Sequence, residues 1–230
     1  MAKTKEKTNA GFSFNDKTLK VLANFASINP SLIVYGDKLA VINNSKSVIG
    51  EYKFDEPFDF ESFGLYECSE FLQAYQAFDK PNFTVEDKYV LISGATDKLK
   101  YYTTAQELIP KVPNVSEKFE KVDCELVFSL SADKLALLNK MAGIIKSKFI
   151  FFETVDKAIR ITVGDELESS ANTYDIAITD GIKTNKLDKP VKIAFSDFKI
   201  LPGDYEIKIS SKISKFTSTF GVEYYIGTSV

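Results

Sequence analysis

The sequence predicts an α+β fold made of two similar halves, each with antiparallel sheets and two helices. Three observations predict it. Short segments in which apolar and polar residues alternate recur along most of the 230 residues, as in strands with one solvated face. Two amphipathic helical segments resemble each other at a fixed spacing. The length also suits two domains of about 110 residues, since compact domains commonly hold roughly 100 to 150.

The first helical segment is predicted over residues 16–28. Its N-cap is Asn15 or Asp16, because either side chain can accept a hydrogen bond from the first turn. An amphipathic helix repeats its apolar residues at intervals of three and four. In this segment the apolar face comprises Leu19, Leu22, Ala23 and Ala26, and Val21 and Phe25 widen it.

The second helical segment is predicted over residues 131–143, with Ser131 as its N-cap and Gly143 as its stop. A shift of 116 residues, which carries residue 28 onto residue 144, superimposes the two segments without a gap. It aligns Leu19 with Leu135, Leu22 with Leu138 and Ala26 with Ala142. The halves are therefore predicted to be duplicates, although chance similarity between two amphipathic helices remains an alternative.

The other elements are predicted from local patterns. A third helix covers residues 68–78, and a short fourth helix starts near Ser196. Residues 58–61 and 205–209 alternate in polarity and are predicted to be half-buried strands. Pro110 and Pro113 interrupt regular structure between the halves, so that stretch is interpreted as an interdomain connector or, alternatively, as a long loop within one larger domain. The predicted limits are an N-terminal extension (1–14), a first domain (15–107), the connector (108–121) and a second domain (122–230).

Composition makes catalysis improbable. The chain has no histidine, which removes the commonest general base and a frequent metal ligand. Cys68 and Cys124 lack the spacing of a metal site, and no phosphate-binding glycine loop or nucleophile elbow is present. We therefore expect no enzyme activity, cofactor or metal. An acidic stretch could form a carboxylate site, but solvation of a strand face explains it better: Asp55, Glu56, Asp59 and Glu61.

Charge and hydropathy limit the partners. A net charge of −3 argues against a surface that binds nucleic acid everywhere, so contact with DNA must be local. No apolar run approaches the roughly 20 residues that span a bilayer, and the N-terminus lacks the apolar core of a secretory signal. We expect a cytoplasmic protein without a membrane partner.

The polar faces of the two duplicated helices are small and basic, as a surface facing a polyanion should be. In the first helix, Lys17, Lys20 and Asn24 lie opposite the apolar face, and in the second, Lys140 takes the place of Asn24. Lysines near other helix ends could extend this surface, although exposed lysines are also the ordinary solvating residues of helices and strands. The candidate DNA-binding residues are Lys17, Lys20, Asn24, Lys140, Lys146, Lys148 and Lys199.

Two stretches, residues 22–29 and 198–205, give the chain a resemblance to a known family. With the length, order and spacing of the elements, they resemble the sliding clamps of T4-type bacteriophages from end to end. Two departures are a longer lysine-bearing N-terminal extension, reaching about Phe14, and a C-terminus at Val230 soon after the last strand.

The resemblance implies a head-to-tail homotrimeric ring whose helices line the hole and whose sheets form the outer wall. Such a ring encircles double-stranded DNA without sequence preference and tethers the replicative DNA polymerase. It also implies a clamp loader and late-transcription factors as partners, in the cytoplasm of an infected bacterial host. Arg160 is the single arginine of the chain, which suits sliding, because lysines make less rigid phosphate contacts than arginine forks do.

The resemblance further implies a pocket for the hydrophobic tails of replication proteins. Candidate lining residues lie in and near the connector, although side chains of these types are often core: Tyr102, Ile109, Val112, Pro113 and Leu201. Two other readings of the chain remain open. One is a β-rich phage structural or assembly protein of a tail or capsid, and the other is an enzyme with a carboxylate- or cysteine-based site.

Overall fold

The computed structural model describes residues 11–165 and 172–230 and divides into two compact units. Unit 1 holds the described residues up to Leu39 together with Phe54–Pro110. Unit 2 holds Ala40–Lys53 together with the described residues from Lys111 onward. The grouping of residues 40–53 with the second half of the chain was not expected from the sequence. Residues 1–10 of the predicted N-terminal extension lie outside the described residues.

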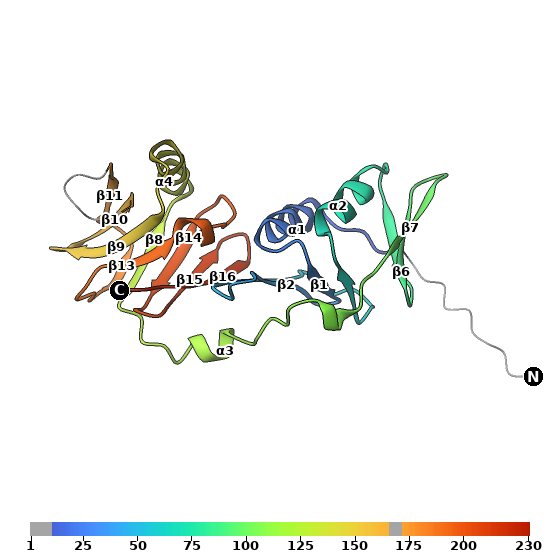
Figure 1. Ribbon diagram of the computed structural model, residues 1–230, viewed down its shortest axis with the longest axis horizontal. Helices are drawn as coiled ribbons and strands as arrows, with labels where there is room; N and C mark the ends of the chain where they lie inside the picture. Colours follow the sequence, from blue (N-terminus) through green and yellow to red (C-terminus); the bar gives the residue numbers. More distant parts are fainter. Residues whose placement is uncertain (1–10, 166–171) are drawn as a thin grey trace, which may run out of the picture. The chain divides into compact units, whose positions relative to one another are not determined.

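Unit 1 contains two α-helices and two sets of antiparallel strands (Figure 1). β1 pairs with β4, and β6 pairs with both β5 and β7. Its elements are α1 (Asp16–Ile28), β1 (Leu32–Tyr35), β4 (Ser62–Leu65), α2 (Cys68–Gln76), β5 (Asn82–Val85), β6 (Tyr89–Ser93), β7 (Lys98–Tyr102) and the 3₁₀ helix η1 (Gln106–Leu108).

α1 has the limits that the sequence predicts. Asn15 is its N-cap, and the side-chain oxygen of Asn15 accepts a hydrogen bond from the Thr18 N–H at 2.8 Å. The buried face includes most of the expected residues, but Ala23 is exposed and Leu19 is half-buried. The helix packs against α2. The buried residues are Thr18, Val21, Leu22, Phe25, Ala26 and Ile28.

The prediction of a strand over residues 58–61 is wrong. The Phe58 N–H donates to the Gly36 oxygen at 2.7 Å, and the Gly36 N–H donates to the Glu61 oxygen at 3.0 Å, so the segment loops around Gly36. The rings of Phe58 and Phe60 stack with centroids 5.5 Å apart, and both contact Phe12 edge-on. Polarity alternates here because these two rings turn toward an aromatic cluster, while the acids between and beside them remain exposed.

Unit 2 contains two sheets and the long helix α4 (Figure 1). Within it, β12, β8, β14, β15, β16 and β3 follow one another in one sheet, and β11, β10, β9 and β13 form the other. Its elements are most of β2 (Lys38–Ile42), β3 (Val48–Lys53), α3 (Ser116–Phe119), β8 (Leu126–Leu130), α4 (Ala132–Ile145), β9 (Phe149–Val155), β10 (Ala158–Gly164), β11 (Tyr174–Ile178), β12 (Ile182–Asn185), β13 (Val191–Ala194), the 3₁₀ helix η2 (Phe195–Asp197), β14 (Tyr205–Ile209), β15 (Ile213–Ser218) and β16 (Val222–Gly227).

α4 begins as the sequence predicts but runs two residues past the expected stop at Gly143. The helix ends instead at Lys146, which takes the left-handed conformation with φ 53°, and the Ser147 N–H donates to the Ala142 oxygen at 2.9 Å. Ser131 occupies the N-cap, yet its side chain makes no capping hydrogen bond to a described residue. The Asp204 carboxylate takes that role and accepts from the Ala132 N–H at 2.7 Å.

The two halves of the chain repeat the same connections. In the first half a helix precedes β1, which pairs with β4, and the half closes with the β5–β6–β7 meander. In the second half α4 precedes β9, which pairs with β13, and the half closes with the β14–β15–β16 meander. The predicted duplication therefore extends beyond the helices. One difference is that the counterpart of α2 is η2, so the predicted fourth helix is a single 3₁₀ turn.

The connector is ordered by its apolar residues. Phe119 of α3 is buried in a cluster with Ile42, Ile49 and Tyr225, and its ring meets the Tyr225 ring at 5.6 Å. Val112 packs against the same cluster. These contacts hold the connector on the outer surface of unit 2, even though two prolines limit its regular structure to η1 and α3.

Candidate nucleic-acid interface

The predicted DNA-binding residues of α1 differ in their exposure and in whether a carboxylate lies beside them. The Lys17 ammonium lies 3.2 Å from both oxygens of the Asp55 carboxylate, and its side chain is 30% exposed. Lys20 is exposed, and Asn24 is half-buried. A cation with a carboxylate neighbour attracts a phosphate less, so Lys20 is the stronger of the two α1 lysines as an anion contact.

α4 carries a more open basic surface. Lys140 is exposed on the helix, and Lys146 is exposed at its C-cap, where the partial negative charge of the helix end favours a cation. Lys134 is also exposed, and sequence reasoning missed it. The signal that could have found Lys134 was its place in the predicted helical segment.

Lys148 and Lys199 lie beyond the helices of unit 2. The Lys148 ammonium is 3.1 Å from the Asp165 carboxylate, and this hydrogen bond together with one from the Lys148 backbone lowers the pKa of Asp165. The Phe195 N–H donates to the Lys148 oxygen at 2.7 Å, so η2 adjoins the loop after α4. Lys199 is exposed just after η2. Lys140, Lys146, Lys148 and Lys199 thus all belong to unit 2.

The residues predicted to line a partner pocket are spread over both units. In unit 1 Tyr102 is 71% exposed, whereas Ile109 is buried, with its Cδ1 2.8 Å from where a Cβ on Gly64 would stand. In unit 2 Val112 is half-buried and Pro113 is exposed. Leu201 is half-buried, and its backbone oxygen accepts from the Tyr205 hydroxyl at 2.6 Å.

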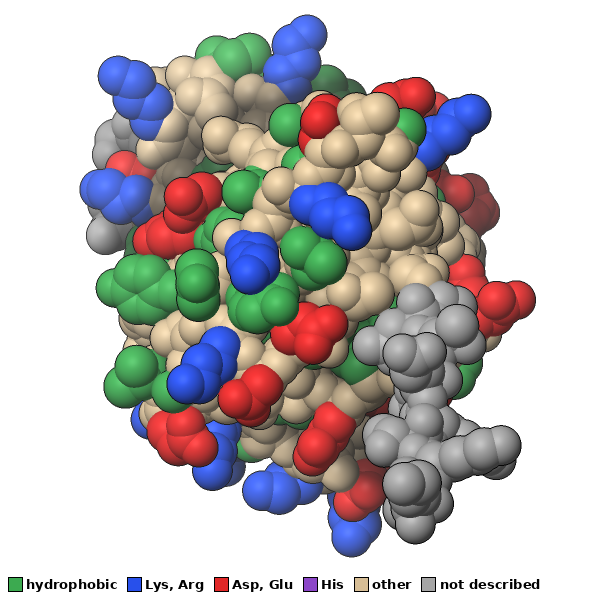
Figure 2. Space-filling view, turned by 90° about the vertical axis from the view of Figure 1, so that its right-hand side faces the viewer, with side chains coloured by type: hydrophobic (Ala, Val, Ile, Leu, Met, Phe, Trp, Pro, Cys, Tyr) green, Lys and Arg blue, Asp and Glu red, His purple; other side chains and the backbone are tan. Residues whose placement is uncertain are grey.

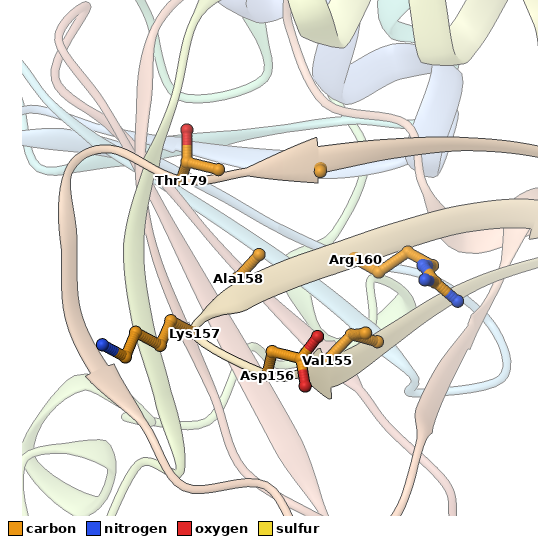
Figure 3. Close-up of a pocket in the computed structure, with 7 residues that line it drawn as sticks. Val155, Asp156, Lys157, Ala158, Arg160 and Thr179 are labelled. Atoms are coloured by element: carbon orange, nitrogen blue, oxygen red, sulfur yellow. The ribbon is translucent and has the colours of Figure 1, made fainter.

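A shallow depression of about 290 Å³ lies at the tip of the β9–β10 hairpin. Figure 3 shows Asp156 and Lys157 at the hairpin turn and Arg160 farther along β10. The Arg160 guanidinium lies 3.3 Å from the Glu153 carboxylate on β9. The single arginine therefore takes part in a cross-strand ion pair, and none of the predicted DNA or partner residues lines this depression.

The remaining candidates for a functional site were metal ligands, a membrane-spanning helix and the acidic stretch. Within residues 11–165 and 172–230, no three histidine, cysteine, aspartate or glutamate side chains gather as metal ligands would. The same part of the chain has no helix long and apolar enough to cross a membrane. Asp55, Glu56, Asp59 and Glu61 are all exposed.

Comparison with known proteins yields one curated relative of nearly the same length. The sliding clamp of Vibrio phage KVP40 is 25% identical over 221 residues, which cover 93% of this chain and 97% of the phage protein. No family model matches the chain. The T4-type subdivision that the sequence suggested is not decided by this similarity and stays a prediction.

Solved structures with the same fold are clamp proteins. PCNA of A. fulgidus, solved with the C-terminal region of FEN-1 bound, is 12% identical and has a TM-score of 0.67, with 93% of this chain and 96% of that chain covered. The PCNA2–PCNA3 complex of Sulfolobus tokodaii has the same identity, a TM-score of 0.65 and coverage of 93% and 96%. The Helicobacter pylori beta clamp is 9% identical with a TM-score of 0.68, and covers 96% and 65%. The predicted fold is thus confirmed, and the chain is similar to a phage sliding clamp in sequence and to clamp proteins in structure.

Proposed function

We propose that the chain is a processivity factor of DNA replication, which encircles duplex DNA as a homotrimeric ring and tethers the replicative polymerase. The observation that carries this proposal is the similarity to a phage sliding clamp over 93% of the chain, combined with the basic surface of α4 on a protein of net charge −3. The chain itself catalyses no step in this role. A β-rich tail or capsid component is not favoured, since clamp proteins supply both the sequence relative and the structural neighbours.

Two edge strands support closure into a ring. β16 pairs with β3 in register from Val222 opposite Tyr52 to Ile226 opposite Val48. By the internal repeat, the counterpart of β16 is β7, and the counterpart of β3 is β11. Each of these is an edge of its sheet among the described residues, and an open edge favours pairing with another strand. Pairing of β7 with β11 of a second copy is a head-to-tail contact, which can close a ring.

Side chains on the two edges are complementary. β7 carries the exposed Lys98 and Lys100 beside Tyr102, and β11 carries the exposed Asp175. Figure 2 shows the side of unit 1 where β6 and β7 lie in Figure 1, with cationic side chains interspersed among hydrophobic and acidic ones. Opposite charges across an interface select the correct partner and orientation, and the trimer that the family resemblance implies would contain three such contacts.

Within the ring the helices would face the DNA. Phosphate contacts from lysines carry no sequence information and weaken with salt, which suits a protein that must hold DNA without stopping at one position. The proposed luminal residues are Lys17, Lys20, Asn24, Lys140, Lys146, Lys148 and Lys199. Encirclement then supplies retention, and the tethered polymerase stays at high effective concentration near its primer end.

Partner proteins would bind outside the lumen. The A. fulgidus structure has a C-terminal region of another protein bound to a chain of this fold, which supports docking of C-terminal segments of partner proteins here. Tyr102, Ile109, Val112, Pro113 and Leu201 remain the proposed lining. The partners we propose are the polymerase, a clamp loader and late-transcription factors, in the cytoplasm of an infected bacterium.

Retention on DNA of different topology tests this function. The chain is loaded onto nicked circular DNA, which is then cut at one site or left circular, and the bound protein is quantified after gel filtration. A ring slides off the linear ends but stays on the circle. Equal retention on both forms would contradict encirclement. Longer extension products from the cognate polymerase in the presence of the chain would test the tethering step.

A further inference from the structure

The two long helices of the chain differ in how they are covered. α1 packs against α2 in unit 1, as Figure 1 shows, and α2 contributes the buried residues Phe71, Leu72 and Tyr75. At the same place in the second half the chain has only η2, a turn of three residues. α4 therefore lacks the covering helix that its counterpart has.

A comparison of aligned residues of α1 and α4 identifies the uncovered face of α4. Val21 and Ile28 of α1 are 0% and 8% exposed, whereas their counterparts Leu137 and Ile144 are 42% and 63% exposed. The next pair of counterparts does not differ in this way, since Leu22 and Leu138 are both buried. The aliphatic side chains that α4 exposes are thus at positions that α1, packed against α2, buries.

The same comparison accounts for an additional cation. Thr18 of α1 is 2% exposed, and its counterpart on α4 is the exposed Lys134. Lys134 and Lys140 stand on either side of the stripe formed by Leu137 and Ile144, because residues three and four apart are neighbours on a helix surface. The open face of α4 therefore combines lysines with aliphatic side chains that cannot hydrogen bond to phosphate.

Charge is distributed unequally between the helices of the two units. α1 and α2 with the Glu67 N-cap carry two lysines and three carboxylates, and Asp55 lies against one of the lysines. α4 with its C-cap carries three lysines and one carboxylate, Asp133, which lies in the first turn. The positive end of the helix dipole compensates an acid there, as it does Asp16 of α1 and Glu70 of α2 in their first turns. By count of charged side chains, α1 and α2 together are thus close to neutral, whereas α4 is basic.

We propose that α4 is the principal DNA-contacting element of each chain, and that Lys134, Lys140 and Lys146 provide its phosphate contacts. The inference rests on the proposed clamp function and assigns the holding of DNA to unit 2. Unit 1 contributes little attraction, because Glu67 and Glu70 offset the charge of Lys20, and Asp55 pairs with Lys17. Leu137 and Ile144 lie against the duplex without bonding to it, which keeps the contact weak enough to slide.

Three variants of the full-length chain test the proposal. One lacks the α4 charges (Lys134→Ala, Lys140→Ala, Lys146→Asn), with asparagine at 146 because it tolerates the left-handed conformation. One lacks the α1 charges (Lys17→Ala, Lys20→Ala). The matched control removes three exposed lysines outside the helices of unit 2 (Lys186→Ala, Lys189→Ala, Lys212→Ala). Binding of each trimer to a short fluorescent duplex is measured by anisotropy at several salt concentrations.

We expect the α4 variant to lose roughly tenfold or more in affinity at low salt and to show a shallower salt dependence, by up to about 0.9 in log–log slope per lost phosphate contact. The α1 variant and the control should each lose about twofold or less. A fourth variant, Glu67→Gln with Glu70→Gln, should bind more tightly than the wild type, because it removes repulsion in unit 1.

The outcomes separate this inference from the proposed function. A loss in the α1 variant equal to or larger than that in the α4 variant overturns the assignment to α4 and leaves the clamp function standing. An affinity that is unchanged in both variants, together with equal retention on circular and linear DNA, overturns both. Circular dichroism and trimer mass confirm that each variant is folded and assembled before its binding is compared.

Discussion

At the residue scale, the two cysteines differ more than the sequence suggested. The sequence treats Cys68 and Cys124 alike, as reduced and ordinary. Cys68 is fully buried beneath α1, and burial raises the pKa of its thiol to about 12. Cys124 is only partly buried, and the pKa of its thiol is also raised, chiefly by burial. The thiolate is the reactive species, and burial raises the pKa of both thiols. The main difference in reactivity between the two cysteines is therefore the access of a reagent to the sulfur.

Maleimide labelling at neutral pH should therefore modify Cys124 first and leave Cys68 unmodified until the chain unfolds. Peptide mass spectrometry along a urea gradient measures both sites in one sample. Modification of Cys68 should follow the unfolding transition, since the site opens only when α1 and α2 separate. Equal labelling rates in the absence of urea would contradict the packing of Cys68 against α1. In a Cys124→Ser variant, Cys68 is the single cysteine, so its labelling rate can be measured alone.

An ion pair on β14 makes a small contribution to stability that depends on pH. A hydrogen bond from the Lys183 ammonium, with further attraction from Lys208, lowers the pKa of Glu206 below its ordinary value. A carboxyl whose pKa is lower in the folded state stabilises the fold above its unfolded pKa, and this contribution is lost as pH falls through the folded value.

Glu206→Gln should thus lower the free energy of unfolding slightly at neutral pH and not at all in strong acid. Urea denaturation at a series of pH values measures the difference between the variant and the wild type. That difference should shrink as pH falls through the acidic range. A constant difference at every pH would mean that packing, and not the charge of Glu206, determines the effect.

The exposure of a side chain was predictable from the sequence where it depends on helix periodicity. Lys20 and Lys140 are exposed as expected. The ion pair between Lys17 and Asp55 could not be predicted, because it joins residues 38 apart through a loop that bends around Gly36. The exposure of Lys134 could not be predicted either, because the short helix expected near Ser196 is only the 3₁₀ turn η2.

At the scale of elements, α4 is capped from outside its own sequence. The Asp204 carboxylate accepts from the Ala132 N–H at 2.7 Å, whereas the Ser131 hydroxyl makes no capping bond to a described residue. Loss of a helix cap typically costs about 0.5–2 kcal/mol. Asp204→Ala should lower the free energy of unfolding by that amount, and Ser131→Ala should lower it by less. Urea denaturation of both variants measures the order, and the reverse order would contradict the cap.

Helix limits were predictable because caps and periodicity are local. The start of α1 follows from the Asn15 cap, whereas α4 starts after Ser131 as predicted although its capping bond comes from the distant Asp204. Two predicted elements were wrong because tertiary packing outweighed local pattern. Residues 58–61 alternate in polarity as a strand does, but their aromatic rings pack on Phe12 and the backbone loops around Gly36. Gly143 stays helical, and Lys146 takes the left-handed position at which the helix ends.

At the scale of the whole molecule, the proposed contact between copies depends on charge across two strand edges. Replacing Lys98 and Lys100 of β7 with glutamate places three acids at the contact with Asp175 and should raise the dissociation constant of the trimer at least tenfold. Adding Asp175→Lys should recover part of the loss, since the charges are then exchanged. Analytical ultracentrifugation over a concentration series measures both. A trimer unaffected by the first change would exclude this pairing of edges.

The duplicated architecture was predictable because two helical segments 116 residues apart have similar sequences. In the structure, the strands of each half also pair in the same order. The grouping of residues 40–53 with unit 2 was not predictable. It arises from the pairing of β3 with β16. These strands are distant in sequence, so no local sequence pattern indicates that they pair.

Electron microscopy of the purified chain tests the central claim most directly, because encirclement requires an opening. Two-dimensional averages should show a ring with threefold symmetry and a central hole wide enough for duplex DNA. Particles without a hole, or open filaments formed by the same head-to-tail contact, would contradict the account.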